Sequence, residues 1–344
     1  MNIGLLIAGL GLGQGTIFAV QTWLVAKGQF ELLSLFATHY SLAMFGIIVV
    51  DGGSSAIIAR NFVQLSSGHG TTDAFWRMVS ETMAVRLLVA LLVGIGAAIY
   101  ALGFAQSDFS RCYVLFALPG LLLWAGNAVG LLDGLKLSGI SGITSAAAYA
   151  ACAIGLAFAP DASPDIAGSI LGGAFSVGYL LTVAAQWAVL RGYGWAPRFR
   201  KVTAAGLSRS FKDGSALLFQ LVPGQIILRI QLVLGTIYLG VETTALFAYV
   251  KQIIAMSTMI IAIVLRVEFP RLVEILSRPI EQRFLVVLKA QMMTLYCAVG
   301  LTGSVIGILA ENDYLDLVER AEIERAENLA ARRENRTKIG RAHV

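Results

Sequence analysis

Charged residues are scarce in this sequence. Asp, Glu, Lys and Arg make up 14% of it, whereas an ordinary soluble domain carries about 25%. Hydrophobic residues make up 57%, and the mean hydropathy is +0.75. So little charge argues strongly against a soluble domain, and we expect an integral membrane protein.

Residues that carry enzymatic or metal chemistry are also few. The three histidines form no ligand cluster, and the sequence contains no GxSxG, phosphate-binding loop or HExxH motif. The three cysteines stand far apart without a CxxC pair, at Cys112, Cys152 and Cys297, which argues against disulfides. We therefore predict that the protein is not an enzyme, with no catalytic residue, no metal and no cofactor.

Long apolar runs are abundant. About 20 apolar residues span the hydrocarbon core as a helix, and helices suit runs that are apolar on every face, such as "LLVALLVGIGAAIYALGFA". A barrel would show alternating segments of about ten residues. We predict a polytopic all-α bundle of nine transmembrane helices, at 3–26, 34–58, 84–106, 113–132, 139–159, 168–190, 215–239, 243–265 and 288–310.

The loops between these runs differ in charge. Fifteen Lys and Arg residues lie in the loops after the even-numbered runs, including Arg60, Arg77 and Arg86 after the second, whereas only Lys27 and Arg111 lie in the alternate loops. Because basic loops stay on the cytoplasmic side, the N-terminus is predicted to be cytoplasmic. The formal net charge of +5 suits an anionic inner leaflet, and no nucleic-acid partner is expected.

The sequence repeats itself at a distance of 211 residues. The polar matches carry the most weight, because apolar matches arise by chance; they pair Gln14 with Gln225, Glu31 with Glu242 and Arg60 with Arg271. Six predicted spans separate the copies, and an even number returns the chain to the same side. The repeat therefore predicts two parallel lobes related by an axis along the membrane normal.

The expected organisation follows from this repeat. It consists of a complete six-helix N-lobe over 1–190, a basic cytoplasmic inter-lobe loop over 191–213, a partial C-lobe over 214–310 and a charged tail over 311–344. The tail stands where further C-lobe helices are expected, so we predict a second lobe truncated after about three helices. The final "KIGRAHV", 338–344, back-translates into DNA that resembles a common sequencing adapter, and we expect it to be non-native.

Several short motifs, taken in order, resemble one transporter family. They are "GLGQGTIFAVQTWLVAKGQFELLSLFA", "DGGSSAIIAR", "LGVETTALFAYVKQI" and "EFPRL". Together with the repeat, they resemble the polysaccharide exporters and O-antigen flippases of the multidrug/oligosaccharidyl-lipid/polysaccharide (MATE-like) superfamily, from about Gly9 to Pro279. Many relatives carry an acidic residue just before the arginine of span 7, where this chain has Leu228, which puts a coupling role there in doubt.

The resemblance implies a function and a location. Two lobes would face each other across a cavity that opens alternately to either leaflet. The substrate would be an undecaprenyl-pyrophosphate-linked oligosaccharide, such as an O-antigen repeat unit in lipopolysaccharide biosynthesis. The protein would act as a monomer in the bacterial cytoplasmic (inner) membrane, with membrane lipids around it. The coupling ion stays open.

Charged side chains within the spans are the first candidates for the site, because burying charge in a bilayer is costly. Arg229 in span 7 and Lys251 in span 8 are predicted to lie at similar depth and to bind the pyrophosphate together. The alternatives are that Lys251 extends to the interface and that Arg229 pairs with an acid or a carbonyl. Gln225 and Gln14 supply neutral hydrogen-bonding groups for a sugar path, or for helix packing.

Asp51 in "DGGSS" has two interpretations. It is a gate or ion site, or it is a carboxylate that accepts serine or backbone hydrogen bonds in a loosened helix, which we favour. Arg60 lies nine residues on and nearly opposite on a helix, so the two need other partners. Arg60 and Arg271 are expected at the cytoplasmic interface.

Two features of the spans concern shape. The amphipathic stretch 73–86 is predicted to be a separate helix on the membrane surface, with a cytoplasmic latch between the lobes as its alternative. Pro223 with Gly224, and Pro119 with Gly120, are predicted to kink spans 7 and 4 or to serve as hinges.

Three other functions compete with the flippase. A cation-coupled multidrug antiporter would need intramembrane acids, of which only Asp51 is present in a span. A membrane-embedded polymerase or glycosyltransferase would need large polar loops. A peptidoglycan-precursor flippase is also cationic inside, and the sequence separates it poorly from the first hypothesis.

Overall fold

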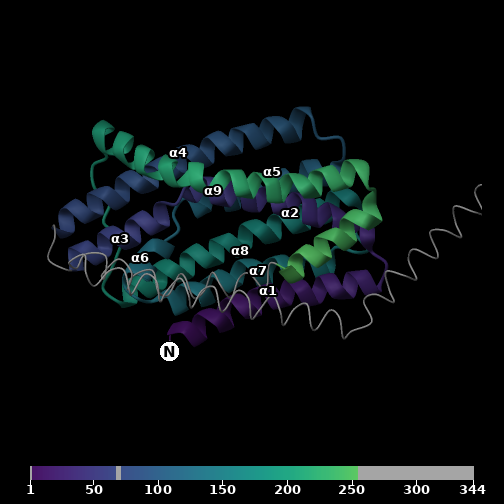
Figure 1. The fold of residues 1–344 in the computed structure, drawn as a ribbon, viewed down its shortest axis with the longest axis horizontal. Helices are drawn as coiled ribbons and strands as arrows, with labels where there is room; N and C mark the ends of the chain where they lie inside the picture. The colour runs from purple at the N-terminus through teal and green to yellow at the C-terminus, as the bar shows by residue number, and fades with distance from the viewer. Residues whose placement is uncertain (1, 67–70, 255–344) are drawn as a thin grey trace, which may run out of the picture. The chain divides into compact units, whose positions relative to one another are not determined.

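The structure is a computed structural model that describes residues 2–66 and 71–254, shown in Figure 1. These residues form helices and connecting turns, with no strand among them. The helices are α1 (Asn2–Ala26), α2 (Phe30–Asp51), α3 (Ser54–Ser66), α4 (Thr72–Gly103), α5 (Asp108–Trp124), α6 (Val129–Gly134), α7 (Ser138–Phe158), α8 (Pro164–Gly192) and α9 (Ala204–Tyr238). A further helix covers 241–254.

The protein is a multi-pass helical membrane protein, as the sequence predicted. Six stretches in the described part are long and apolar enough to cross a bilayer: Gly4–Ala26, Phe30–Ser66, Thr72–Gly103, Asp108–Gly134, Ser138–Phe158 and Pro164–Gly192. The bent helix α9 makes a seventh if its two parts count as one span. The predicted span 288–310 lies outside the described residues, as does the second part of span 243–265.

Close packing of small residues holds the first six spans together. A Cβ on Gly9 of α1 would lie 2.5 Å from the backbone of Gly142 in α7, so these two helices approach at backbone distance. Gly168 and Gly172 of α8 likewise lie against the backbone of α5. Because lipid tails are as apolar as the side chains, close backbone approach of this kind is a main source of helix association in membranes.

The predicted surface helix over 73–86 is not a separate element. These residues form the first half of α4, which continues without a break into the apolar run that ends at Gly103. Phe75, Trp76 and Val79 are buried in a cluster with α3 and α6. The apolar side of the amphipathic pattern is therefore a helix face that other helices cover, and the prediction of a helix on the membrane surface is wrong.

The connection between α8 and α9 is shorter than the predicted loop over 191–213. Its non-helical part covers 193–203, because α9 already begins at Ala204. It packs on α3 and α4: Trp195 contacts the rings of Phe62 of α3 and of Phe75 and Trp76 of α4, with ring centroids 4.8 to 6.3 Å apart. At its other end, Thr203 donates from its hydroxyl to Glu81 Oε1 over 2.8 Å. The linker is thus fixed at both ends.

Helix α9 bends as its proline predicts. Its parts Ala204–Phe219 and Val222–Tyr238 meet at 52°, directly before Pro223. Helix α5 contains Pro119 and remains one helix there. Ser176 of α8 bridges the backbone there, accepting from the Gly120 N–H over 2.9 Å and donating to the Phe116 carbonyl over 2.5 Å.

Candidate functional site

Two of the spans are broken near the same level. The first break separates α2 from α3 at Gly52 and Gly53, whose φ angles of +54° and +72° are left-handed. Only glycine adopts such angles at little cost, so these two residues allow the helix to stop and restart. The second break separates α5 from α6 over 125–128. The two restarted helices touch, since a Cβ on Gly130 of α6 would overlap the Ser55 carbonyl of α3.

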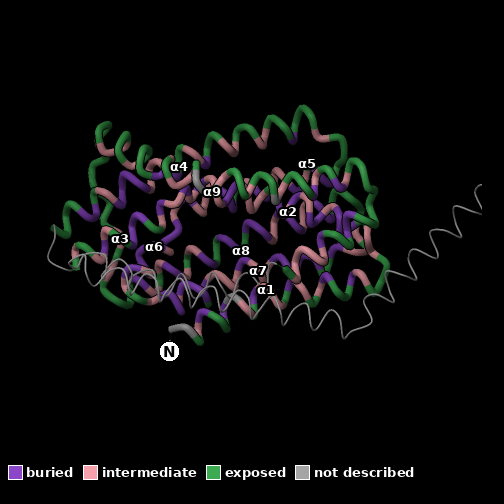
Figure 2. Tube along the Cα trace, viewed as in Figure 1, coloured by how far each residue is buried: buried purple, intermediate pink, exposed green. Residues whose placement is uncertain are grey.

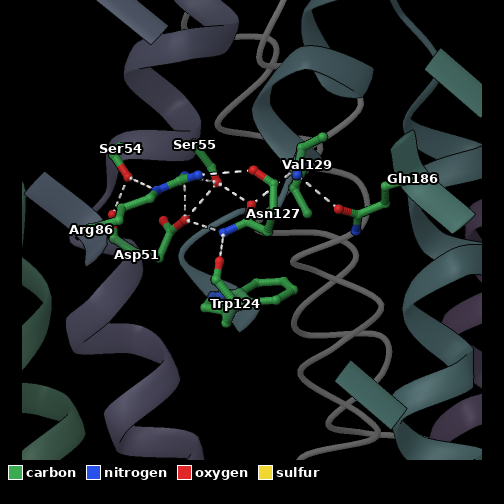
Figure 3. A network of polar contacts seen from close by, with 9 residues as sticks. Asp51, Ser54, Ser55, Arg86, Trp124, Asn127, Val129 and Gln186 are labelled. Atoms are coloured by element: carbon green, nitrogen blue, oxygen red, sulfur yellow. Dashed lines mark hydrogen bonds and ion pairs between the residues drawn. The ribbon is translucent and has the colours of Figure 1, made fainter. Parts of the chain in front are cut away.

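Arg86 of α4 joins the two breaks. Its side chain is 1% exposed, and Nη2 lies 2.7 Å from Asp51 Oδ1. The guanidinium also donates from Nη2 to Ser55 Oγ over 2.9 Å, from Nε to Ser54 Oγ over 2.5 Å and from Nη1 to the Asn127 carbonyl over 3.0 Å. Figure 3 shows these side chains converging from α2, α3, α4 and the α5–α6 break.

Side chains also satisfy the remaining backbone groups at the second break. Gln186 of α8 accepts from the Ala128 N–H over 2.8 Å, and Trp187 donates to the Gly126 carbonyl over 2.7 Å. Asn127 donates to the Trp124 carbonyl over 2.9 Å. Backbone groups freed in a membrane span need partners within the protein, and this network supplies them (Figure 3).

Asp51 therefore lies in a hydrogen-bonded network. Its carboxylate accepts from Ser55 Oγ over 2.6 Å as well as from Arg86, and its own carbonyl accepts from Ser54 Oγ. This geometry fits the structural interpretation of "DGGSS". The side chain is 22% exposed, and it also lines a narrow pocket with Phe211 and Leu218 of α9.

A second group of polar contacts joins α1 and α2 to α9 and the helix over 241–254. We call it the polar seam; its pairs are Gln14 with Gln252, Thr22 with Tyr249, Thr38 with Thr236 and Ser41 with Arg229. The distances are 2.6 to 3.2 Å. Tyr249 also stacks on Phe18, with centroids 5.2 Å apart. The seam contains two of the four residues proposed for substrate binding, Gln14 and Arg229, and a third, Gln225, contacts Arg229.

Arg229 is the only charged member of the polar seam. It donates from Nη1 to Ser41 Oγ over 3.0 Å and from Nη2 to Gln225 Oε1 over 3.5 Å. Its Nε is buried without a hydrogen-bond partner in the described part of the chain, where no carboxylate forms an ion pair with it either. The guanidinium thus has neutral neighbours and an unused donor.

The other predicted site residues separate into two places. Lys251 lies in the helix over 241–254, with its ammonium 5.9 Å from the centre of the Phe247 ring, and the next residue, Gln252, donates to Gln14 over 2.6 Å. Arg60 lies on the exposed face of α3 and lines a cavity of about 370 Å³ with Arg77 and Arg209. Arg271 lies outside the described residues.

Sequence reasoning missed Arg86. The prediction from sequence places Arg86 among the basic loop residues, whereas its side chain is fully buried. A usable signal was present: Asp51 needs a basic partner within a span, and Arg86 directly precedes the apolar run "LLVALLV". Ser41, which binds Arg229, gave no comparable signal.

Comparisons of the sequence and structure with family models, curated proteins and solved structures found no match. Within residues 2–66 and 71–254, no group of three or more His, Cys, Asp or Glu side chains is placed to hold a metal ion.

Proposed function

We propose that this protein moves an anionic, lipid-linked glycan across the membrane. The substrate class is a polyprenyl-pyrophosphate oligosaccharide, as in the polysaccharide exporters and O-antigen flippases that the sequence resembles. The proposal includes two lobes, alternating access, a cytoplasmic N-terminus and a location in a bacterial inner membrane. The multi-pass helical architecture is compatible with each of these.

One observation carries the proposal: Arg229 lies in a membrane span with neutral hydrogen-bond partners and an unused Nε donor, and the next helix along the chain carries a second cation, Lys251. Placing the Arg229 guanidinium within a bilayer costs free energy, which an anionic ligand offsets. A pyrophosphate offers several acceptor oxygens and matches the planar guanidinium, with the ammonium as a point charge.

The same geometry weighs against the antiporter alternative. Cationic drugs would need an available carboxylate within the spans, and Asp51 already accepts from Arg86 and Ser55. The hydrogen-bond partners of Arg229 are a hydroxyl and an amide, from Ser41 and Gln225, and Gln14 pairs with Gln252 on the helix that also carries Lys251. Neutral groups of this kind suit sugars.

The test is equilibrium binding of a fluorescent polyprenyl-pyrophosphate oligosaccharide to the full chain in nanodiscs. We expect saturable binding that an excess of unlabelled glycolipid displaces and a cationic dye does not. Arg229→Ala removes the unused donor and one charge, so it should weaken binding by about ten- to a hundredfold, since hydrogen bonds to charged groups contribute about 1.5–3 kcal/mol each.

The matched control is Arg111→Ala, which removes one arginine from the exposed first turn of α5. It should leave binding within the error of the native chain. Equal weakening by both variants, or no effect of Arg229→Ala, would contradict the assigned role of Arg229. Saturable binding of the dye in place of the glycolipid would favour the antiporter.

A further inference from the structure

A cavity of about 190 Å³ lies between α2, α4 and α5, away from both polar groups described above. The residues that line it are almost all apolar, among them Leu42 and Gly46 of α2, Val93 and Ala97 of α4, and Leu118 of α5. Phe175 of α8 also lines it.

The face of α4 that lines this cavity is less buried at the cavity than next to Arg86. Arg86, Ala90, Val93 and Ala97 follow one another at three- or four-residue spacing and therefore share one face. Arg86 and Ala90 are 1% and 0% exposed, whereas Val93 and Ala97 are partly exposed. Figure 2 shows exposed positions along the second half of α4. The helix is thus less closely packed against α2 and α5 between Ala90 and Ala101, which is again 0% exposed.

The cavity suits neither water nor a polar ligand. Three of its lining residues carry polar groups, His39, Tyr100 and Tyr113. Both ring nitrogens of His39 already have partners, the Leu35 carbonyl and Ser110 Oγ, each at 2.8 Å. The Tyr113 hydroxyl is buried without a hydrogen-bond partner in the described part of the chain, but a single hydroxyl does not hold a water. A water needs two to four polar partners, and an engineered apolar cavity of about 150 Å³ stays dry yet binds small hydrocarbons. The remaining chemistry that fits is hydrocarbon.

The surroundings supply a hydrocarbon. The outer face of α4 carries exposed Leu92, Ile95 and Ile99, as expected of a helix in contact with lipid tails. On α2, the cavity takes Leu42 and Gly46, whereas Thr38 and Ser41 contact α9 in the polar seam. The cavity and the seam thus lie on different sides of α2, which separates this ligand from the proposed glycolipid.

We propose that this cavity binds the acyl chain of a bilayer phospholipid. The chain fills the space between α4 and the pair α2 and α5, and so supports α4 beyond the point where Arg86 fixes it. This binding is independent of the proposed transport function.

The test uses the full chain in phospholipid nanodiscs that contain a phosphatidylethanolamine with a photoreactive diazirine in the middle of one acyl chain. After illumination, mass spectrometry locates the labelled residues. We expect labelling of the inner positions Val93 and Ala97 and of Leu118, in addition to the outer face of α4. Ala97→Phe fills the cavity and should lower labelling of Leu118 several-fold.

Ile99→Phe is the matched control, because it adds an aromatic ring two residues away on the exposed face; labelling of Leu118 should not change. Ala43→Leu fills the cavity from α2 and repeats the test if Ala97→Phe is not monodisperse. Labelling of Leu118 that is the same in both filling variants as in the native chain would overturn the proposal. So would loss of that labelling when a polyprenyl pyrophosphate is added, because the occupant would then be the isoprenoid.

Discussion

Arg86 and Arg77 lie on the same helix and illustrate how environment decides what an ion pair contributes. Arg86 and Asp51 are 1% and 22% exposed, and serine hydroxyls and a carbonyl complete the shell. Arg77 and Asp73 are 56% and 52% exposed, with 3.7 Å between nitrogen and oxygen. Water screens the second pair, so only the first should matter for stability.

We predict that Arg86→Met lowers the free energy of unfolding by about 3–5 kcal/mol, because it leaves the Asp51 carboxylate buried without its cation. Arg77→Met should cost at most about 1 kcal/mol. Thermal unfolding in detergent, followed by tryptophan fluorescence, measures both.

A double variant, Arg86→Met with Asp51→Leu, separates the charge effect from the packing effect. It should recover part of the lost stability, since no isolated charge remains. A double variant less stable than Arg86→Met by the full cost of a second deletion would contradict the pairing.

At the residue scale, sequence reasoning identified which charges are unusual but not what they contact. Asp51, Arg229 and Lys251 stand out because charge within an apolar run is rare. Their partners come from distant parts of the chain: Arg86 is 35 residues from Asp51, and Ser41 is 188 residues from Arg229. Sequence spacing defines faces of one helix only, and these contacts depend on how the helices pack.

Breaks and bends are the features that matter at the scale of the element. Spans were predictable from hydropathy because any spanning helix must be apolar over a known length. The sequence indicates the break at Gly52 and Gly53 through "DGGSS", and it indicates the bend of α9 through Pro223. The break over 125–128 was not predicted, because the proline that indicated a change of direction in this span, Pro119, lies earlier, where α5 is one helix and Ser176 bridges its backbone.

The contact between the two restarted helices predicts the effect of a single methyl group. In Gly130→Ala, the new Cβ would overlap the Ser55 carbonyl and lie 3.0 Å from Ile58 Cβ. We expect a loss of about 1–3 kcal/mol, the usual cost of overpacking, seen as a lower unfolding temperature in detergent.

Gly173→Ala is the control, because a Cβ there meets no atom within 4 Å. It should be neutral or slightly stabilising, given the helix propensity of alanine. If both variants unfolded at the same temperature, α3 and α6 would not be in contact at Gly130.

At the scale of the whole molecule, the contacts of interest are those between the first six spans and the helices that follow them. The repeat predicts which helices correspond, but not how α1 and α2 contact α9 and the helix over 241–254, because these surfaces carry single threonines, serines and glutamines rather than a motif. The polar seam is therefore a finding of the structure alone.

Cysteines can test the polar seam directly. Thr38 and Thr236 have hydroxyls 3.2 Å apart, which suits the short Cβ separation of about 3.5–4.5 Å that a disulfide requires. In a background without Cys112, Cys152 and Cys297, Thr38→Cys with Thr236→Cys should form a disulfide under mild oxidation. Loss of both maleimide-reactive thiols measures it.

The control pair is Thr38→Cys with Ile237→Cys, since Ile237 is 66% exposed and adjacent in sequence. It should keep both thiols. Equal oxidation of the two pairs would show that α2 and α9 have no fixed register, and the polar seam would then be wrong.

The docked linker has a mechanical consequence. Residues 193–203 are attached to α4 through Trp195 and Thr203, so the start of α9 is tied to the first six spans, and Leu217 lies against Gly53. The 52° bend before Pro223 is then the first point after this attachment at which the chain changes direction. If the proposed alternating access moves the later helices, Ala204–Phe219 stays with the first six spans, and the contacts of Arg229 and Thr236 with α2 have to break before the rest of α9 moves.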